Sequence, residues 1–143
     1  MRVYEDFAHH PTAVRETLAG LRARHPEGRL FAVFEPRSAT ASRNLHQAEY
    51  ADAFRVADVA ILAPVGRKEI GAEERLDVAA IVAAIESSGR TASAAPSIEA
   101  IIARLVGETR AEDTVVLMSN GAFGGIYDRV LVSLSARAMP RRE

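Results

Sequence analysis

The sequence predicts an α/β fold: a three-layer α/β/α, Rossmann-like domain with five mainly parallel strands. Short apolar runs alternate five times with longer segments of helical periodicity, an order that requires strand–helix–strand units with right-handed crossovers. Two runs, Leu30–Phe34 and Thr114–Met118, lack the polar alternation of half-exposed strands, as expected for strands covered on both faces. A length of 143 residues is enough for one domain with a substantial core.

The first half of the chain predicts three strands and two helices. A strand is expected at residues 3–7, and a helix begins at Pro11, where the missing N–H of proline costs nothing. This helix carries an apolar stripe at helical spacing, formed by Val14, Leu18 and Leu21. After a turn at residues 25–28, the expected elements are a strand at 30–34, a polar loop at 35–44, a helix at 45–56 and a strand at 59–62.

The second half continues the alternation. A charged loop at residues 65–72 precedes a helix marked by Val78, Ile81, Val82 and Ile85. The strand at 91–95 is predicted mainly from its position in the alternation. Ser97 is a typical N-cap for the helix that follows it. The last elements expected are a strand at 114–118, a glycine-rich loop at 119–125 and a helix carrying Ile126, Val130 and Leu134.

The composition argues against several classes of function. The formal net charge is −1, so bulk electrostatics do not favour nucleic-acid binding. The chain has no cysteine, which excludes disulfides and thiolate metal sites and fits a reducing compartment. No apolar run approaches the roughly 20 residues of a membrane span. We therefore expect a cytoplasmic protein that binds neither nucleic acid nor membrane.

Three polar loops follow strands and precede helices. They are Asp6–Pro11, Glu35–Asn44 and Ser119–Gly125. In open α/β sheets, ligands bind at the carboxyl ends of the strands, where helix N-termini also offer free N–H groups. The predicted fold therefore brings all three loops to the same edge of the sheet, and we expect the functional site there.

His9 and His10 are the most distinctive residues of the first loop. Adjacent imidazoles diverge, and no third ligand is evident nearby, so no metal site is predicted. One imidazole could instead cap the helix that begins at Pro11. We favour a direct polar contact between these side chains and a ligand, with helix capping as the alternative.

The other two loops carry residues suited to anions. In the third loop, Ser119, Asn120 and Gly121 could approach a phosphate or carboxylate, although a plain turn also uses glycines. In the second loop, Arg37 could bind an anion with both arms of its guanidinium, or it could pair with Glu35 at the surface. The sequence contains neither a phosphate-binding P-loop nor a nucleophile–base motif. Residue chemistry alone therefore reaches an anion-binding α/β domain.

Three collinear segments resemble the C-terminal domain of the Mur ligase family. Val-Tyr-Glu-Asp-Phe-Ala-His-His-Pro-Thr-Ala at residues 3–13 resembles two branches, the UDP-N-acetylmuramate–alanine ligases and the murein peptide ligases of cell-wall recycling. Phe-Glu-Pro-Arg-Ser-Ala-Thr at 34–40 and Met-Ser-Asn-Gly-Ala-Phe-Gly-Gly-Ile at 118–126 resemble the second branch. Ala39 and Ala122 replace the Asn and Gly usual in that branch, and Ala39 cannot make the side-chain contact of that Asn.

The resemblance implies that residues 1–143 are the peptide-binding C-terminal domain of a longer, three-domain ligase. Such an enzyme joins L-alanyl-γ-D-glutamyl-meso-diaminopimelate to UDP-N-acetylmuramate with ATP and Mg²⁺. The lactyl carboxylate is phosphorylated first, and the peptide amine then attacks the acyl phosphate. The N-terminal domain binds the UDP-sugar, and the central domain supplies the P-loop and most of the ATP and Mg²⁺ contacts. We expect no catalytic residue in this domain and no activity from it alone.

The resemblance also assigns roles to individual positions. Asp6 is expected to approach the ribose of ATP. Ser119 and Asn120 would hold the incoming peptide, and Gly121 would give it room. The residues expected to face the peptide and the acyl phosphate are His9, His10, Arg37, Ser38 and Thr40.

Two further implications concern topology and alternatives. The resemblance implies the strand order 1-5-2-3-4, which sets the Asp6 and Ser119 loops side by side. The alanine-adding branch is the first alternative, disfavoured by Arg37-Ser38 where that branch has His-Arg. The second alternative is a stand-alone module that binds an anionic metabolite.

Overall fold

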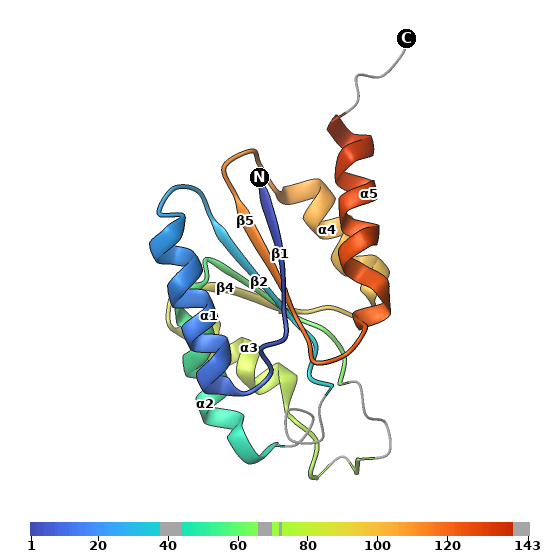
Figure 1. Cartoon of the computed structure of the whole chain (residues 1–143). Helices are drawn as coiled ribbons and strands as arrows, with labels where there is room; N and C mark the ends of the chain where they lie inside the picture. The colour runs from blue at the N-terminus through green and yellow to red at the C-terminus, as the bar shows by residue number, and fades with distance from the viewer. Residues whose placement is uncertain (38–43, 66–69, 72, 139–143) are drawn as a thin grey trace.

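The structure is a computed structural model that describes residues 1–37, 44–65, 70–71 and 73–138. Strands and helices alternate along these residues (Figure 1). The bounds are β1 (Arg2–Asp6), α1 (Pro11–Arg24), β2 (Leu30–Phe34), α2 (Gln47–Ala53), β3 (Val59–Leu62), α3 (Val78–Ser87), β4 (Thr91–Ala94), α4 (Ile98–Glu108), β5 (Thr114–Met118) and α5 (Ile126–Ala138).

The five strands form one parallel sheet in the order β1-β5-β2-β3-β4. Helices α1, α2 and α3 cover one face, and α4 and α5 cover the other (Figure 1). The predicted fold class, the parallel pairing and the strand order are therefore confirmed. Because β5 is inserted between β1 and β2, the last strand in the sequence lies beside the first.

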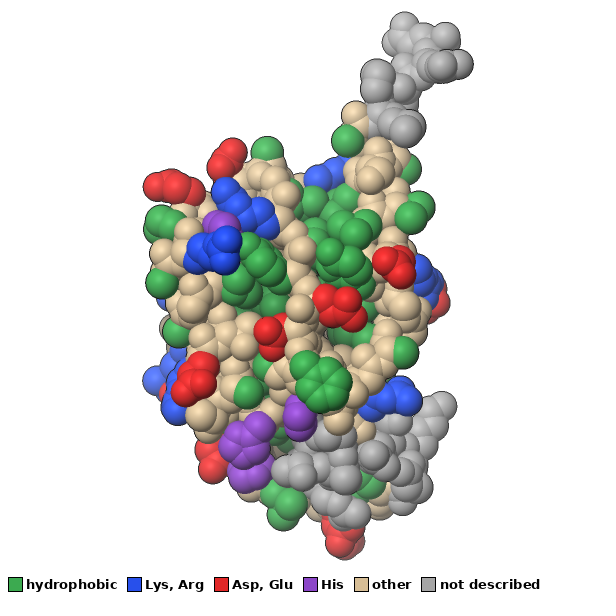
Figure 2. Space-filling view, in the orientation of Figure 1, with side chains coloured by type: hydrophobic (Ala, Val, Ile, Leu, Met, Phe, Trp, Pro, Cys, Tyr) green, Lys and Arg blue, Asp and Glu red, His purple; other side chains and the backbone are tan. Residues whose placement is uncertain are grey.

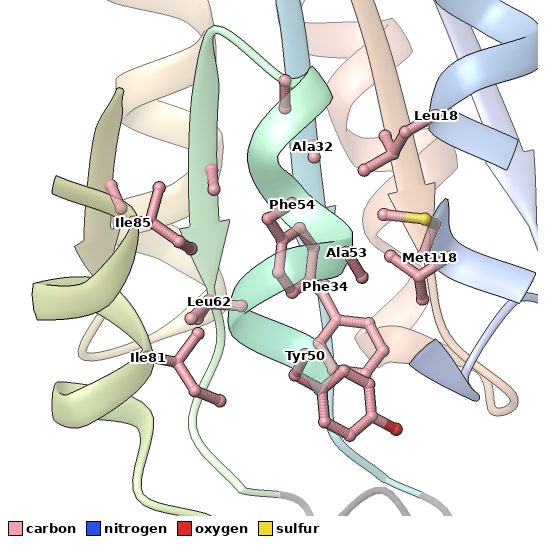
Figure 3. Packing of buried hydrophobic residues seen from close by; sticks show 14 of the residues in the cluster. Leu18, Ala32, Phe34, Tyr50, Ala53, Phe54, Leu62, Ile81, Ile85 and Met118 are labelled. Carbon is pink, nitrogen blue, oxygen red and sulfur yellow. The ribbon is translucent and has the colours of Figure 1, made fainter. Parts of the chain in front are cut away.

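Successive residues of each buried strand point to opposite faces of the sheet and belong to two separate hydrophobic cores. In β2, Ala32 and Phe34 belong to the cluster under α1, α2 and α3, whereas Phe31 and Val33 belong to the cluster under α4 and α5. Figure 3 shows the first cluster, in which Phe34 packs against aromatic residues of and just beyond α2. Burying one such side chain contributes about 1.5–3 kcal/mol relative to leaving it exposed. The continuous apolar runs predicted from the sequence are explained by this two-sided burial.

Most predicted boundaries agree with the structure, including the Ser97 cap, whose hydroxyl accepts a hydrogen bond from Ala100 N at 3.1 Å. The helix predicted at 45–56 is instead a short α-helix between two 3₁₀ turns, at 44–46 and 54–56. Ala57 N donates to Phe54 O at 3.0 Å, which closes the second turn. The tighter turn ends the helix early enough for β3 to begin at Val59.

The amino edge of the sheet is held by a buried carboxylate. Asp113, whose side chain is 3 % exposed, accepts hydrogen bonds from the Arg29 backbone at 3.0 Å, the Arg29 guanidinium at 2.8 Å and Arg110 N at 2.8 Å. Burial acts to raise the pKa of the Asp113 carboxyl, but these hydrogen bonds outweigh it, and the pKa lies below its ordinary value.

Candidate functional site

The described parts of the three polar loops meet at the carboxyl edge of the sheet. Ser119 N donates to Asp6 O at 3.2 Å, and Glu35 N donates to Met118 O at 3.0 Å. The helices that follow β1 and β2 lie on one face of the sheet, and the helix that follows β5 lies on the other (Figure 1). The connections on both sides of β5 therefore lead to opposite faces, the arrangement at which open α/β sheets bind ligands.

Asp6 shapes the first loop. Its Oδ1 accepts hydrogen bonds from Ala8 N at 2.8 Å and from the Thr17 hydroxyl at 3.4 Å. Its Oδ2 makes no hydrogen bond to any described residue. One oxygen therefore holds the turn that leads into α1, and the other remains available as an acceptor.

His9 and His10 have opposite tautomers. Nδ1 of His9 lies 3.0 Å from Phe7 O, and because a carbonyl only accepts, this nitrogen carries the proton. Nδ1 of His10 accepts from Thr12 N at 3.3 Å and is therefore unprotonated. Neutral His9 thus offers Nε2 as an acceptor, and neutral His10 offers Nε2–H as a donor. The capping role considered for one imidazole is confirmed for His10.

Helix α2 holds this loop from the side. The Tyr50 hydroxyl donates a hydrogen bond to His9 O, and the His46 ring packs 4.7 Å from the His10 ring. Burial raises the pKa of Tyr50 well above its ordinary value, so its hydroxyl is a neutral donor. Histidine side chains gather at this end of the molecule (Figure 2). A cavity of about 300 Å³ lies between the start of α1 and helix α2. It is lined by His10, Pro11, Thr12, Arg15, Ala48, Glu49 and Asp52.

Sequence reasoning missed Tyr50, since in a helical stripe it has the signature of an ordinary core aromatic. His46 is half-buried against His10 and lies 3.0 Å from the Glu49 carboxylate. His25 is half-buried and hydrogen-bonded to Tyr4. No short-range pattern in the sequence indicates these contacts between distant elements.

The second and third loops are joined by a hydroxyl–carboxylate hydrogen bond. The Ser119 hydroxyl donates to Glu35 Oε1 at 2.8 Å and accepts from Gly121 N at 3.0 Å. Glu35 is only 7 % exposed. Sequence reasoning considered Glu35 only as a surface partner for Arg37, whereas the carboxylate is buried and fixes the start of the Ser119 loop.

Arg37 extends from the second loop over the third. A Cβ atom on Gly121 would lie 2.3 Å from Arg37 Cδ, so the space above Gly121 is taken by the Arg37 side chain. Gly121 was expected to give room to the peptide, and in this structure it gives room to Arg37. Ser38 and Thr40, the other expected contacts of this loop, lie outside the described residues.

The remaining glycines of the third loop serve the turn itself. Gly124 and Gly125 have φ angles of 57° and 67°, and the buried Phe123 has a φ of 47°. The plain-turn interpretation therefore holds for Gly124 and Gly125. Oδ1 of Asn120 is buried and has no hydrogen-bond partner among the described residues. Leaving a buried acceptor without a partner costs about 1–3 kcal/mol.

Within the described residues, no group of three metal-ligating His, Asp or Glu side chains could hold a metal ion. In the same part of the chain, no helix combines the length and apolar character needed to cross a membrane.

Comparison with known proteins gives consistent results in sequence. Residues 1–121 match the family described as "Mur ligase, glutamate ligase domain". The chain is 32 % identical over 136 residues to the UDP-N-acetylmuramate–L-alanyl-γ-D-glutamyl-meso-2,6-diaminoheptandioate ligase of Haemophilus influenzae, covering 94 % of this chain and 28 % of that one. It is 34 % identical over 146 residues to the UDP-N-acetylmuramate–L-alanine ligase of Symbiobacterium thermophilum, covering 99 % of this chain and 29 % of that one.

Solved structures agree. A murein peptide ligase from Psychrobacter arcticus matches with a TM-score of 0.73 and 31 % identity, over 98 % of this chain and 28 % of that one. A single domain from Haemophilus ducreyi, assigned to a UDP-N-acetylmuramate:L-alanyl-γ-D-glutamyl-meso-diaminopimelate ligase, matches with a TM-score of 0.71 and 31 % identity, over 95 % and 90 % of the two chains. The chain thus spans little more than a quarter of its full-length relatives, and it belongs to the Mur ligase family through the domain described as the glutamate ligase domain.

Proposed function

We propose that this chain is the C-terminal, peptide-binding domain of a longer three-domain ligase. The ligase uses ATP to join L-alanyl-γ-D-glutamyl-meso-diaminopimelate to UDP-N-acetylmuramate in the recycling of peptidoglycan, in the cytoplasm. The observation that carries this proposal is the meeting of three features at one sheet edge: the double-histidine loop (Asp6–Pro11), Arg37 and the Ser119 loop (Ser119–Gly125). The relative from Haemophilus influenzae that bears this activity in its name supports the choice of substrate.

The peptide is an anion that also carries N–H donors, and the site offers partners for both. Arg37 would bind a carboxylate with its guanidinium. The orphaned Asn120 Oδ1 would accept an N–H of the peptide, and the Nε2 atoms of His9 and His10 would act as acceptor and donor. Ser119 would act through the segment that its hydroxyl fixes, because that hydroxyl already donates to Glu35. Ser38 and Thr40 are assigned to the same region by family resemblance.

ATP and Mg²⁺ would be bound mainly by the central domain of the longer chain, where ATP supplies the phosphoryl group that activates the lactyl carboxylate. This domain would add an edge contact to the nucleotide. Asp6 Oδ2, which no described residue uses, suits a ribose hydroxyl. The described residues offer no three-ligand cluster for the metal. The UDP-sugar would lie on the N-terminal domain.

The test is product formation by the longer natural chain. It is incubated with ATP, Mg²⁺ and UDP-N-acetylmuramate, with either the tripeptide or L-alanine as acceptor, and the products are identified by mass spectrometry. We expect UDP-N-acetylmuramoyl-tripeptide, ADP and phosphate. Product from L-alanine alone would support the alanine-adding ligase, the second candidate favoured by the Symbiobacterium relative. Absence of both products would leave the stand-alone anion-binding module.

A further inference from the structure

We infer that Tyr50 is a positioning residue of the candidate site: its buried hydroxyl holds the His9 carbonyl and thereby sets the double-histidine loop for the peptide. The inference rests on the proposed function for its catalytic consequence, because the position of the loop matters to ligation only if the loop contacts the peptide. Its structural part, the hold on the loop, can be tested without any activity.

Hydrogen bonds within the double-histidine loop set its internal shape. Within it, Ala8 N bonds to Asp6, the His9 ring bonds to Phe7 O, and Thr12 N bonds to the His10 ring, each only two residues apart. Contacts with other elements place the loop on the molecule: Ser119 N donates to Asp6 O at its start, and the His46 ring packs against the His10 ring. Tyr50 is 41 residues from His9 in sequence, and its hydrogen bond ties the middle of the loop to α2.

The Tyr50 ring is packed inside the hydrophobic core. Tyr50 is fully buried, and its ring lies 5.3 Å from the ring of Phe34, which in turn lies 5.6 Å from the ring of Phe54 (Figure 3). Phe34 is the last residue of β2 and immediately precedes Glu35. The same aromatic cluster therefore supports the double-histidine loop and the start of the second loop. The Tyr50 hydroxyl therefore fixes the position of the double-histidine loop relative to the loop that begins at Glu35.

The bonded carbonyl is the one that matters for both histidines. The His9 carbonyl belongs to the peptide plane that connects His9 to His10, so a shift of this carbonyl moves both imidazoles. Without the hydroxyl, the carbonyl would lose its partner and the plane would turn toward water. In an enzyme, a displacement of about 1 Å can cost about a hundredfold in rate.

The chain contains a matched control. Tyr4 also bonds through its hydroxyl, to the His25 ring at 2.7 Å, where α1 ends rather than where it begins. Tyr50→Phe and Tyr4→Phe each remove one oxygen and one tyrosine hydrogen bond. Only the first change touches the double-histidine loop.

The first measurement is NMR of the histidine rings in the 143-residue chain. Tyr50→Phe is expected to shift the imidazole resonances of His9 and His10 and to leave His25 unchanged. Tyr4→Phe is expected to do the reverse. Unchanged His9 and His10 resonances in a folded Tyr50→Phe protein would overturn the hold on the loop. If Tyr50→Phe does not fold, the same spectra are recorded on Phe34→Leu. This variant keeps the Tyr50 hydroxyl but loosens the packing of its ring, and it should broaden or shift the resonances of His9 and His10.

The second measurement is steady-state kinetics of the longer ligase. Tyr50→Phe is expected to lower kcat/KM for the tripeptide by about tenfold while KM for ATP changes by less than about twofold, because ATP is held mainly elsewhere. Tyr4→Phe is expected to match the wild type. A Tyr50→Phe enzyme with a lower melting temperature but unchanged peptide kinetics would make Tyr50 a purely structural residue. If the wild type itself does not ligate the tripeptide, the proposed function fails, and the NMR result alone decides whether Tyr50 positions the loop.

Discussion

Arg37 lies directly over the backbone of Gly121, across the gap between two loops that are 84 residues apart at Glu35 and Ser119. A Cβ atom on Gly121 would be 2.3 Å from Arg37 Cδ and 2.5 Å from Arg37 Nε. The absence of a side chain at position 121 permits this close approach. The backbone itself does not demand glycine there, because Gly121 is not among the residues with positive φ. The absence of a side chain at Gly121 therefore leaves room for the arginine that we propose as the anion contact.

Gly121→Ala should displace Arg37 with little loss of stability. Arg37 is exposed and can move aside, so the free energy of unfolding should change by less than about 1 kcal/mol. In the longer ligase, kcat/KM for the tripeptide should fall about tenfold because the guanidinium loses its place. Gly20→Ala is the control, because nothing lies within 4 Å of a Cβ atom there. Equal activity of the two variants would show that the position of Arg37 does not affect ligation of the tripeptide.

Patterns in the sequence were sufficient to predict the fold class and the meeting of the three polar loops at one edge of the sheet. The alternation of strands and helices, and the continuous apolar runs of strands buried on both faces such as Leu30–Phe34, can be recognised from the local periodicity of the sequence. The strand order depended on family resemblance, because periodicity does not reveal that β5 inserts beside β1. The three-loop location followed from the parallel sheet, since every carboxyl end of such a sheet lies at one edge.

The individual contacts could not be predicted in the same way. The bonds Tyr50–His9, Glu35–Ser119 and Arg37–Gly121 join residues far apart in sequence, and each depends on how two loops meet. Burial decides their character as well. Glu35 lies in a polar stretch of sequence typical of a surface loop, but it is buried. Tyr50 is a core aromatic whose hydroxyl also reaches the candidate site.

The isolated 143-residue chain should neither hydrolyse ATP nor form product. The sequence has no P-loop, and the described residues offer no three-ligand metal cluster. Asp6 alone would give only an edge contact, so ATP affinity measured by calorimetry should be poor. Tight ATP binding by the isolated chain would count strongly against its assignment as the peptide-binding domain.

Acid should weaken the amino edge of the sheet through Asp113. Its folded-state pKa lies below the ordinary value of 3.8, so its contribution is complete at higher pH and is lost as the pH falls through the folded-state pKa. At pH 7, Asp113→Asn should destabilise the protein by about 1.5–3 kcal/mol, because the Arg29 guanidinium loses its charged hydrogen bond to the carboxylate. Urea unfolding from pH 7 to pH 2 should show the difference between the two proteins shrinking below about pH 4. A difference that stays constant with pH would exclude this linkage.

Two glycines with positive φ separate backbone strain from steric clash. Gly28 and Gly89 have φ angles of 75° and 85°, but only at Gly28 would a Cβ atom meet a backbone atom, the Glu112 carbonyl oxygen, at 2.1 Å. Gly89→Ala should cost about 1–2 kcal/mol from φ alone. Gly28→Ala should cost clearly more, since a backbone carbonyl cannot move aside as a side chain can. Thermal unfolding of both variants tests this, and equal losses would refute the clash.

The measurement that most directly tests the account is the effect of Arg37→Ala on the kinetics of the longer ligase. A charged hydrogen bond in a closed site contributes about 1.5–3 kcal/mol, whereas an exposed ion pair contributes about 0–1 kcal/mol. We predict that kcat/KM for the tripeptide falls by roughly ten- to a hundredfold, with the melting temperature and KM for ATP nearly unchanged. Arg37→Lys should recover only part of the loss, because an ammonium lacks the two-armed geometry. Unchanged tripeptide kinetics together with a lower melting temperature would contradict the account and make Arg37 a structural residue.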